Sequence, residues 1–354
     1  MIIKSSSKKY EVNIKNDLGF IEDLKKEENT LFVIDKILYG LYKNSLFQDI
    51  PHVKLYIIEA IEANKTIESA LGICEIMTNI PAKRNAHLIS FGGGIVQDVT
   101  GFVANVLYRG IHWTFVPTTL LAACDSCIGG KTSLNYKQYK NLLGTFYPPD
   151  AIYICSEFFN TLSERDFKSG LGEVVKFNIM FGKKGLIKIE NNIEALLLRS
   201  HGILDEFVKL SLLFKKVFIE EDEFDKGVRI HLNFAHTFGH AFETVSNYLI
   251  PHGTAVAIGT LVADRISLGR GLLEECIVTR IESVLKKIIN VELLPTSFDL
   301  DKMVGAIRKD KKQINSNLTG VLLYDDMKLK VYHDLQKEEI ERAIIYVLQF
   351  LRKR

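Results

Sequence analysis

Short runs rich in β-branched and aromatic residues alternate with stretches of helical length in the first half of the chain. The predicted strands are 10–14, 31–34, 53–58, 87–91, 113–116 and 151–155. Segments of helical length, such as 65–78 and 95–107, lie between several of them. Strands that alternate with helices predict a mostly parallel sheet that is covered on both faces. In such sheets ligands bind at the carboxyl ends of the strands.

From about residue 160 the strand pattern largely disappears, and apolar positions recur with helical spacing. The predicted helices are 164–180, 203–221, 231–248, 253–269, 273–290 and a closing helix at 337–352. Residues 319–333 read as a hairpin that turns at Asp325-Asp326. We therefore expect a Rossmann-like α/β domain over 1–158 and a largely α-helical domain over 159–354.

The composition is that of an ordinary globular protein. The chain has 354 residues, 47% of them hydrophobic and 25% charged, with a formal net charge of +2. Such a balance gives no indication of nucleic-acid binding, so any bound anion requires a local basic cluster. The N-terminus has no apolar core of signal-peptide length, and no apolar run approaches the roughly 20 residues that span a bilayer. We expect a soluble cytoplasmic protein without a membrane partner.

The five cysteines are too few and too scattered for a disulfide framework. Cys124 and Cys127 form a C-x-x-C pair that could be a redox or zinc motif. Because no second pair accompanies it, small residues in a packed turn are the favoured interpretation.

The segment SFGGGIVQD, residues 90–98, runs from a strand through three glycines into a helix, with Asp98 in its first turn. Glycines let the backbone approach a phosphate, and a helix N-terminus offers free N–H groups. The pattern is not the full dinucleotide fingerprint, and glycines of a tight turn without a ligand explain it equally well.

A second glycine pair precedes Lys131, with Lys140 and Asn141 following. The sequence resembles the end of a P-loop, but the earlier glycine is missing, since Cys124 or Asp125 stands there. A loop that presents Lys131 to a phosphate or carboxylate remains open, and so do simply solvated lysines.

Glu173 and Lys176 lie three residues apart and share a helix face. A surface ion pair is one interpretation. The flanking apolar residues indicate instead a buried helix, in which a carboxylate needs a partner or a metal.

Three histidines gather in the stretch HTFGHAFETVSNYLIPHG. Thr237 stands where the zinc-protease signature H-E-x-x-H has its glutamate, so that signature is excluded. Helical spacing would place four polar residues in one stripe, which suits an anionic ligand beside a metal: Arg229, Asn233, His236 and His240. Two imidazoles plus a carboxylate make a plausible catalytic zinc set. Glu173 is the best carboxylate, because Asp222 and Glu223 belong to a charged run that reads as solvated.

These motifs fall into an order that resembles the 3-dehydroquinate synthases of the sugar-phosphate cyclase family. The similarity runs from Asp35 to Lys312 and includes GGGIVQD, YRG, VPTTLLA, DSCIGGKT, KNLLGTFYPP, GEVVK, DEFDKGVR, LNFAHTFGHAFE, HG and DKK. Many separate motifs in the right order are far more specific than any one of them.

The resemblance implies an enzyme that uses catalytic NAD and one divalent metal, zinc or cobalt. It would convert the sugar-phosphate acid 3-deoxy-D-arabino-heptulosonate 7-phosphate into 3-dehydroquinate and phosphate, a step of the shikimate pathway. Oxidation of a hydroxyl, phosphate elimination, reduction and ring closure follow one another, so the net reaction is that of a phosphate lyase.

The resemblance also assigns residues. The metal ligands would be Glu173, His236 and His252. The phosphate would be contacted by His240, Asn233, Asn141, Lys131 and one of Lys311 and Lys312. Lys215 and Arg229 would grip the substrate, with Arg229 as a bidentate clamp on its carboxylate. Asp125 and Lys176 would lie around the reacting hydroxyls, and Arg109 would reach the site from a partner subunit, which implies a homodimer. The NAD positions would be Asp35, Glu62, Lys65, Gly93, Gly94, Ile95, Asp98, Thr118 and Thr119, and Lys131 and Lys140 would serve both cofactor and substrate.

The chain departs from the family pattern at a few positions. Ile61 and Ala235 replace glycines, Cys127 replaces a serine, Phe177-Asn178 replaces Tyr-Gly, and Thr254 replaces a glutamate two residues after His252. An acidic group beside a ligand histidine commonly tunes it, so Thr254 bears on metal affinity or rate.

Four alternatives remain open from the sequence. A sister cyclase that makes a valiolone or deoxy-inosose would be expected to alter Arg229, Asn233 and His240, which this chain keeps. An amino-dehydroquinate synthase shares the carboxylate. An NAD- and metal-dependent alcohol dehydrogenase of the same build would not need Lys131, Lys140, Lys215 and Arg229 to converge. A binding protein descended from the enzyme is the fourth.

Overall fold

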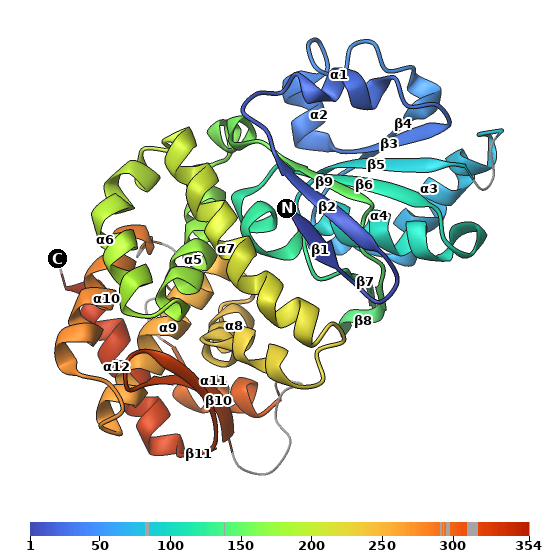
Figure 1. The fold of residues 1–354 in the computed structure, drawn as a ribbon. Coiled ribbons are helices and arrows are strands. Elements are labelled where there is room, and N and C mark those ends of the chain that lie inside the picture. Colours follow the sequence, from blue (N-terminus) through green and yellow to red (C-terminus); the bar gives the residue numbers. More distant parts are fainter. Residues whose placement is uncertain are drawn as a thin grey trace. The chain divides into compact units, whose positions relative to one another are not determined.

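A computed structural model describes residues 1–81, 85–137, 139–290, 292, 294, 298–309 and 318–353 (Figure 1). The chain divides into two compact units, Met1–Thr161 and Leu162–Arg354. The division falls close to the boundary that the change of hydrophobic pattern indicates.

The first unit is built on a seven-stranded sheet with the order β1-β2-β9-β6-β5-β3-β4. Its strands are β1 (Ile2–Lys4), β2 (Lys9–Ile14), β3 (Thr30–Asp35), β4 (Leu55–Ile58), β5 (His87–Gly92), β6 (His112–Pro117) and β9 (Ala151–Ile154). Only β1 and β2 pair antiparallel, and the other neighbours pair parallel. The mostly parallel sheet predicted from the sequence is confirmed.

The central strands are buried almost throughout. In β3 the first five residues are buried, and in β5 the last five are. Strands buried on both faces read as continuous apolar runs rather than alternating ones, which is why these segments stand out in the sequence. The run at 53–58 is shorter as a strand than expected, because His52–Lys54 forms a 3₁₀ turn before β4.

Helices lie on both faces of this sheet. Figure 1 shows α1 (Phe20–Lys25) and α2 (Lys36–Tyr42) on one side and α3 (Ile67–Thr78) and α4 (Gly94–Val106) on the other. Right-handed crossovers that leave β3 and β5 in opposite directions produce this arrangement. Between them run the short turns η2 (Glu62–Asn64), η3 (Leu107–Arg109) and η5 (Ser156–Thr161) and a π-helical turn, η4 (Ala122–Ser126).

A separate antiparallel hairpin follows the second glycine pair. It consists of β7 (Lys131–Tyr136) and β8 (Tyr139–Phe146). Gly129 and Gly130 precede it with φ of 103° and 65°, conformations that side chains with a Cβ rarely adopt. Lys131 is thus the first residue of β7, directly after this glycine turn, and Lys140 and Asn141 stand on β8.

The second unit is mainly helical. Its helices are α5 (Glu164–Met180), α6 (Lys183–Leu197), α7 (His201–Glu221), α8 (His236–Val245), α9 (His252–Gly269), α10 (Glu275–Ile288), α11 (Leu300–Arg308) and α12 (Lys337–Arg352). A 3₁₀ turn, η6 (Val228–Asn233), and the hairpin of β10 (Leu318–Tyr324) and β11 (Lys328–Leu335) complete it. α6 and α11 were not predicted.

Helix α9 is the core of this unit. Fourteen residues between Gly253 and Ser267 are buried, on every face of the helix. A helix that is apolar all round needs neighbours on all sides, and α9 contacts α5, α8, α10, α12 and β10. Within the described residues, no helix combines the length and apolarity needed to cross a membrane.

The predicted helix over 231–248 is wrong at its beginning. Ala235 has a φ of 70° and a ψ of −25°, a left-handed conformation that separates η6 from α8. An alanine in this region is strained, and the chain cannot continue a right-handed helix through it. Helix α8 therefore starts at His236.

Candidate metal centre and nucleotide-binding edge

The crossing of α5 and α9 depends on two glycines. A Cβ on Gly172 would lie 2.0 Å from the carbonyl oxygen of Gly253, and a Cβ on Gly253 would lie 1.7 Å from that of Ser169. The Ser169 hydroxyl accepts a hydrogen bond from the backbone N–H of Gly253 at 3.0 Å. The two backbones thus touch directly, which brings the next residue of α5, Glu173, to the first residue of α9, His252.

Helices α8 and α9 approach in the same way. A Cβ on Gly259 would lie 2.3 Å from the carbonyl oxygen of Ala235 and 2.7 Å from the backbone nitrogen of Gly239. This contact holds the beginning of α8 against α9. His236, the first residue of α8, therefore faces the same point as His252.

The result is a compact group of one carboxylate and two imidazoles. His236 Nε2 lies 3.3 Å and His252 Nε2 lies 3.5 Å from Glu173 Oε1. The ligand atoms of the three residues all lie within 4.8 Å of one another. A carboxylate and two imidazoles are a known ligand set for zinc, and three protein ligands leave a position for substrate.

Glu173 is a buried carboxylate that has a cation at one oxygen and two imidazoles near the other. Its side chain is fully buried. Lys176 Nζ lies 2.6 Å from Oε2, whereas the contacts of both histidines are to Oε1. Burial raises the pKa of the Glu173 carboxyl, but the charges of Lys176 and His236 hold it well below its usual range. The group is thus ionised and ready to bind a cation.

His252 lies between two carboxylates. Its Nε2 faces Glu173, and its Nδ1 lies 3.2 Å from Oε2 of Glu243. Burial lowers the pKa of His252, but the hydrogen bonds to Glu173 and Glu243 more than offset this and raise it to about 10. A metal must displace this proton, so its binding depends on pH.

His240 stands one turn after His236 on α8. Its ring centroid lies 5.5 Å from that of His236 and 6.0 Å from that of His252. His240 is not part of the Glu173 group, although it forms a second possible grouping with Glu243 and His252. The expectation that His236 and His240 share a helix face is confirmed, because both belong to α8.

Arg229 and Asn233 do not extend that stripe. Both belong to η6, before the left-handed residue Ala235, so helical spacing from His236 does not apply to them. Arg229 is buried, and its Nη1 donates to the carbonyl oxygen of Glu223 at 2.5 Å. The position of these two side chains is set by the loop before α8.

Asp222 holds this loop. Its carboxylate accepts hydrogen bonds from the backbone N–H groups of Lys226, Gly227 and Arg229 at 2.9, 2.7 and 3.0 Å. Two of these hydrogen bonds are solvent-exposed, so Asp222 keeps contact with solvent, as the sequence indicated, and also has a structural role. A carboxylate that accepts several N–H groups orders a turn, and here the turn ends at Arg229.

In the first unit, the direction of the strand connections reverses between β3 and β5. The chain leaves β3 towards β4 and leaves β5 towards β6, which makes their carboxyl ends the topological switch point of the sheet. Asp35 ends β3, and Gly93 is the N-cap of α4 directly after β5. Gly94 and Ile95 follow in the first turn of α4, whereas Asp98 lies in its second turn and not, as expected, in its first.

Two of these positions have visible local roles. Asp35 caps α2, because its Oδ1 accepts the backbone N–H groups of Ile37 and Leu38 at 2.7 and 3.1 Å. A Cβ on Gly93 would lie 3.1 Å from Cγ2 of Thr119, the second threonine after β6. Gly93 thus allows Thr119 to pack closely against the turn, and Thr118 binds the turn through its N–H to the Gly92 carbonyl at 2.9 Å.

Lys65 joins α4 to the β7–β8 hairpin. Its buried ammonium pairs with Asp98 and donates to Oδ1 of Asn141 at 2.5 Å. Ser133 donates to Oδ2 of Asp98 at 3.3 Å. Burial raises the pKa of Asp98 above its usual value, and the charge of Lys65 opposes that effect.

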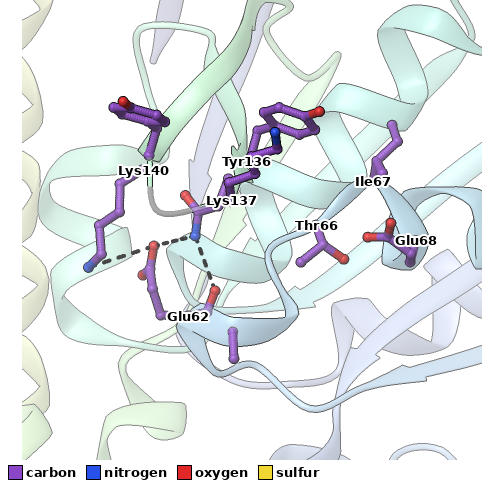
Figure 2. A pocket seen from close by; sticks show the side chains of 10 residues that line it. Glu62, Thr66, Ile67, Glu68, Tyr136, Lys137 and Lys140 are labelled. Atoms are coloured by element: carbon purple, nitrogen blue, oxygen red, sulfur yellow. Dashed lines mark hydrogen bonds and ion pairs between the residues drawn. The ribbon is translucent and has the colours of Figure 1, made fainter.

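Glu62 and Lys140 face each other at the rim of a pocket of about 460 Å³ that also includes Thr66, Asn135 and Tyr136. Figure 2 shows the Lys140 ammonium directed at the Glu62 carboxylate, at a distance of 3.8 Å. Asn135 donates to Oε1 of Glu62 at 2.8 Å. The pocket lies beside the Lys65 contacts, because the next residue along β8 from Lys140 is Asn141.

The remaining predicted residues are placed as follows. Asp125 lies in η4, flanked by the buried thiols of Cys124 and Cys127, and a packed turn is what the structure shows for this C-x-x-C pair. Lys215 is buried on α7. Arg109 is exposed at a turn in which Tyr108, Arg109 and Gly110 all have positive φ. Lys311 and Lys312 lie outside the described residues.

Sequence reasoning missed Glu243 and the contact glycines. Glu243 stands seven residues after His236 and three after His240, so helical spacing places it on the same face of α8. That signal could have found it. The roles of Gly172, Gly253 and Gly259 depend on which helices cross, and no local pattern contains that information.

The first unit has a mostly parallel sheet with a glycine turn at its switch point, and the helical unit brings a carboxylate and two imidazoles together. These features define a class of protein. It is the class of two-domain proteins that can hold a dinucleotide on one domain and a divalent metal on the other. The family profiles "3-dehydroquinate synthase N-terminal" and "3-dehydroquinate synthase C-terminal" match residues 55–169 and 170–313. The chain belongs to the 3-dehydroquinate synthase family.

Similar proteins support this membership. A 3-dehydroquinate synthase from Clostridium tetani is 38% identical over 347 residues, which cover 95% of this chain and 92% of that protein. The fold is similar to that of a 2-epi-5-epi-valiolone synthase from Streptomyces hygroscopicus, solved with NAD+ and Zn2+, with a TM-score of 0.86, 24% identity and coverage of 98% of both chains. A 2-deoxy-scyllo-inosose synthase, solved with NAD+ and Co2+, has a TM-score of 0.85, 24% identity and coverage of 97% of this chain and 98% of that chain.

Proposed function

We propose that this protein is a 3-dehydroquinate synthase that converts 3-deoxy-D-arabino-heptulosonate 7-phosphate into 3-dehydroquinate and phosphate, and so acts as a phosphate lyase. The observation that carries the proposal is the buried Glu173 with His236 and His252 around it, in a member of this family. The identity to a 3-dehydroquinate synthase favours this activity over the sister cyclases.

Glu173, His236 and His252 would hold the metal, and the switch point of the sheet would hold NAD. When bound, NAD takes up and returns a hydride while the metal polarises the oxygen of the hydroxyl that is oxidised. The fit of both groups rests on this chain's own residues: a buried, ionised carboxylate with two imidazoles beside it, and a helix N-terminus capped by a glycine, whose N–H groups suit a phosphate.

The other side chains of the second unit would bind and orient the substrate. Lys176 is held beside Glu173 and donates to the carbonyl oxygen of Leu232 at 3.4 Å, so its ammonium is fixed near a hydroxyl bound at the metal site. Arg229, fixed by the Asp222 turn, would clamp the substrate carboxylate. His240 would contact the phosphate with Asn233.

On the first unit, we assign Asp35, Glu62, Lys65, Gly93, Gly94, Ile95, Asp98, Thr118 and Thr119 to NAD, and Lys131, Lys140 and Asn141 to anionic groups. Asp125 would contact a reacting hydroxyl. These assignments are supported by the placement of most of these residues at the switch point or on the hairpin next to it.

The central experiment measures phosphate release from the heptulosonate phosphate by protein loaded with NAD and zinc or cobalt. We expect release that a chelator abolishes and that added metal restores. Absence of release from the fully loaded protein would exclude the proposed reaction. Parallel assays with sedoheptulose 7-phosphate and glucose 6-phosphate, sugar phosphates without the carboxylate, should give little or none.

A pair of variants separates the roles of the two α8 histidines. His236→Ala should lose the metal, whereas His240→Ala should retain it and raise KM. Metal content per chain and the kinetic constants are the measurements. Loss of metal in both variants would overturn this division.

We also propose a homodimer in which Arg109 completes the partner's site. Arg109 is exposed, and both Tyr108 and Arg109 have a positive φ, which has an energetic cost that strained backbone at functional positions often shows. Mixing inactive Arg109→Ala and His236→Ala proteins should restore activity, because a mixed dimer contains one intact site. Failure of the mixture to regain activity, with dimers shown by sedimentation, would reject this role.

A further inference from the structure

Glu243 is an acid of the metal region that the proposed mechanism does not use. It lies in the last turns of α8, and its side chain is 14% exposed. Its Oε2 lies 3.2 Å from Nδ1 of His252, nine residues further along the chain and at the beginning of the next helix. The contact therefore ties α8 to the first residue of α9.

The two ring nitrogens of His252 face different carboxylates. Nδ1 faces Glu243 at 3.2 Å, and Nε2 faces Glu173 at 3.5 Å. If Nδ1 carries the proton and donates it to Glu243, the lone pair of Nε2 points at the Glu173 group. A metal ligand needs that tautomer, since only an unprotonated nitrogen can bind the ion.

His236 has an equivalent arrangement with a different acceptor. Its Nδ1 lies 3.1 Å from the backbone carbonyl oxygen of Phe234, while its Nε2 faces Glu173. Both candidate ligands are thus oriented through Nδ1, one by a backbone carbonyl and one by a carboxylate. Thr254, two residues after His252, is neutral, and the carboxylate at Nδ1 of His252 is that of Glu243.

We propose that Glu243 is a positioning residue, which accepts the Nδ1 proton of His252 and so fixes the tautomer and the ring orientation in which Nε2 binds the metal. The proposal rests on the metal ligands of the proposed function but not on the reaction catalysed. A carboxylate behind a ligand histidine also raises the basicity of the ligand nitrogen, which strengthens the bond to the metal.

One other arrangement involves the same residue. The ligand atoms of His240, Glu243 and His252 also lie within 4.8 Å of one another, so Glu243 could itself be a ligand. We favour the positioning role because all three members of that grouping are only partly buried, whereas Glu173 is fully buried. In that grouping His252 would also turn its Nδ1, rather than Nε2, to the ion.

The test measures metal affinity directly, by competition between the protein and a chromophoric chelator for Zn²⁺ or Co²⁺. Glu243→Ala should weaken the affinity about 10- to 100-fold, the usual effect of removing such a partner. Glu243→Gln keeps an oxygen acceptor without the charge, so it should restore part of the loss. Glu190→Gln is the matched control, because Glu190 pairs with Arg280 on α6 and α10 and should leave affinity unchanged.

The absorption spectrum of the cobalt-loaded protein decides between the two roles. A positioning residue leaves the ligand set intact, so Glu243→Gln should keep the wild-type band pattern at saturating Co²⁺. If Glu243 is a ligand, Glu243→Gln changes that pattern and loses affinity as completely as His252→Ala, which overturns the proposal. Unchanged affinity in folded Glu243→Ala overturns it as well.

Two controls keep the outcome readable. Circular dichroism and thermal melting of the metal-free variants show whether they fold, and if Glu243→Ala does not, Glu243→Gln alone decides. Protein that binds metal in this Glu243-dependent manner but releases no phosphate would refute the proposed reaction and leave this inference standing. Normal phosphate release, combined with metal binding that does not depend on Glu243, would support the proposed reaction and refute the role of Glu243.

Discussion

The two polar clusters of this molecule are built in different ways. In the second unit, Glu173, His236 and His252 are brought together by helices whose backbones touch at glycines. In the first unit, Lys65 follows the turn η2. It contacts Asp98 on helix α4 and Asn141 on the exposed strand β8. Glu173 is paired with Lys176 and faces two imidazoles at its other oxygen, whereas the ammonium of Lys65 contacts Asp98 and Asn141.

The difference concerns what a ligand must do on arrival. A metal that binds as proposed would find Glu173, His236 and His252 already close together and would displace a proton from His252. A dinucleotide that binds near Lys65 must compete with contacts that the protein already makes. The first cluster should therefore be sensitive to changes in helix packing, and the second to changes in its own side chains.

The largest effect should come from Gly172→Ala. The added Cβ would lie 2.0 Å from a backbone oxygen, so α5 and α9 must separate. We expect a loss of stability at or above the roughly 3 kcal/mol upper end of ordinary overpacking, together with loss of metal. Gly305→Ala, in a helix with nothing within 4 Å of the new Cβ, is the control and should be neutral or stabilising. Normal metal content in Gly172→Ala would show that the glycine contact does not set the site.

Lys65→Met should break the other cluster. Asp98, whose side chain is 21% exposed, would lose its cationic partner, and removal of a partner from a partly buried group costs about 1–3 kcal/mol. The pKa of Asp98 should rise further. Chemical denaturation and NAD titration are the measurements, and metal affinity should not change. If Lys65→Met lost metal affinity but kept its affinity for NAD, the proposed independence of the two clusters would be wrong.

Asp264 provides a contrast to Glu173 on the core helix α9. It is fully buried, and no hydrogen bond to its carboxyl is formed within the described residues. Burial raises its pKa well above the usual value, nearby Glu282 adds to the shift, and Arg265 opposes it. Because the folded pKa exceeds the unfolded one, the neutral group stabilises the fold at low pH. That stability is lost as the pH rises from about 4 through the folded value.

Asp264→Asn should therefore match the wild type at pH 4 and become the more stable protein as the pH rises. Each unit of pKa elevation corresponds to about 1.4 kcal/mol, or a shift in melting temperature of about 3–6 °C in a domain of this size. Thermal melts from pH 4 to 9 measure it. A constant difference between the two proteins at every pH would show that Asp264 has a partner or is ionised.

The smallest effect should come from Ala235→Gly. Ala235 has a φ of 70°, in the region where glycine is favoured, and the change should stabilise the fold by about 1 kcal/mol or less. A rise of about 1–3 °C in melting temperature, with metal affinity unchanged, is expected. A fall in stability would mean that the methyl group of Ala235 packs usefully and outweighs the strain.

The sheet and most long helices could be predicted from the sequence, because they depend on local patterns. α5 and α12 have the predicted ends, since Ser163 and the Gln336–Glu339 capping box mark their beginnings. The β7–β8 hairpin could not be predicted in this way. Every residue of β8 is exposed or partly buried, so the strand has no alternation of buried and exposed positions. α6 begins after Gly182, which offers no side-chain cap, so no capping residue marks its beginning.

The grouping of Glu173, His236 and His252 was predicted because these side chains are chemically distinctive and because the motif order resembles a family. The continuous stripe from Arg229 to His240 was wrong, since a single left-handed residue at 235 interrupts the helix and an alanine gives no warning of it. The need for glycine at position 253 could not be predicted, because it comes from the contact with Ser169 on another helix and not from any local sequence pattern.

The glycine contacts have a consequence for how this protein tolerates random substitution. In a library covering every position, Gly172, Gly253 and Gly259 should score as intolerant as Glu173 and His252, although none of the three bears a functional group. Activity alone would then mark both kinds of position as one active site. Screening the same library for folded abundance separates them, because loss of a ligand side chain spares the fold, whereas a methyl group between touching backbones does not.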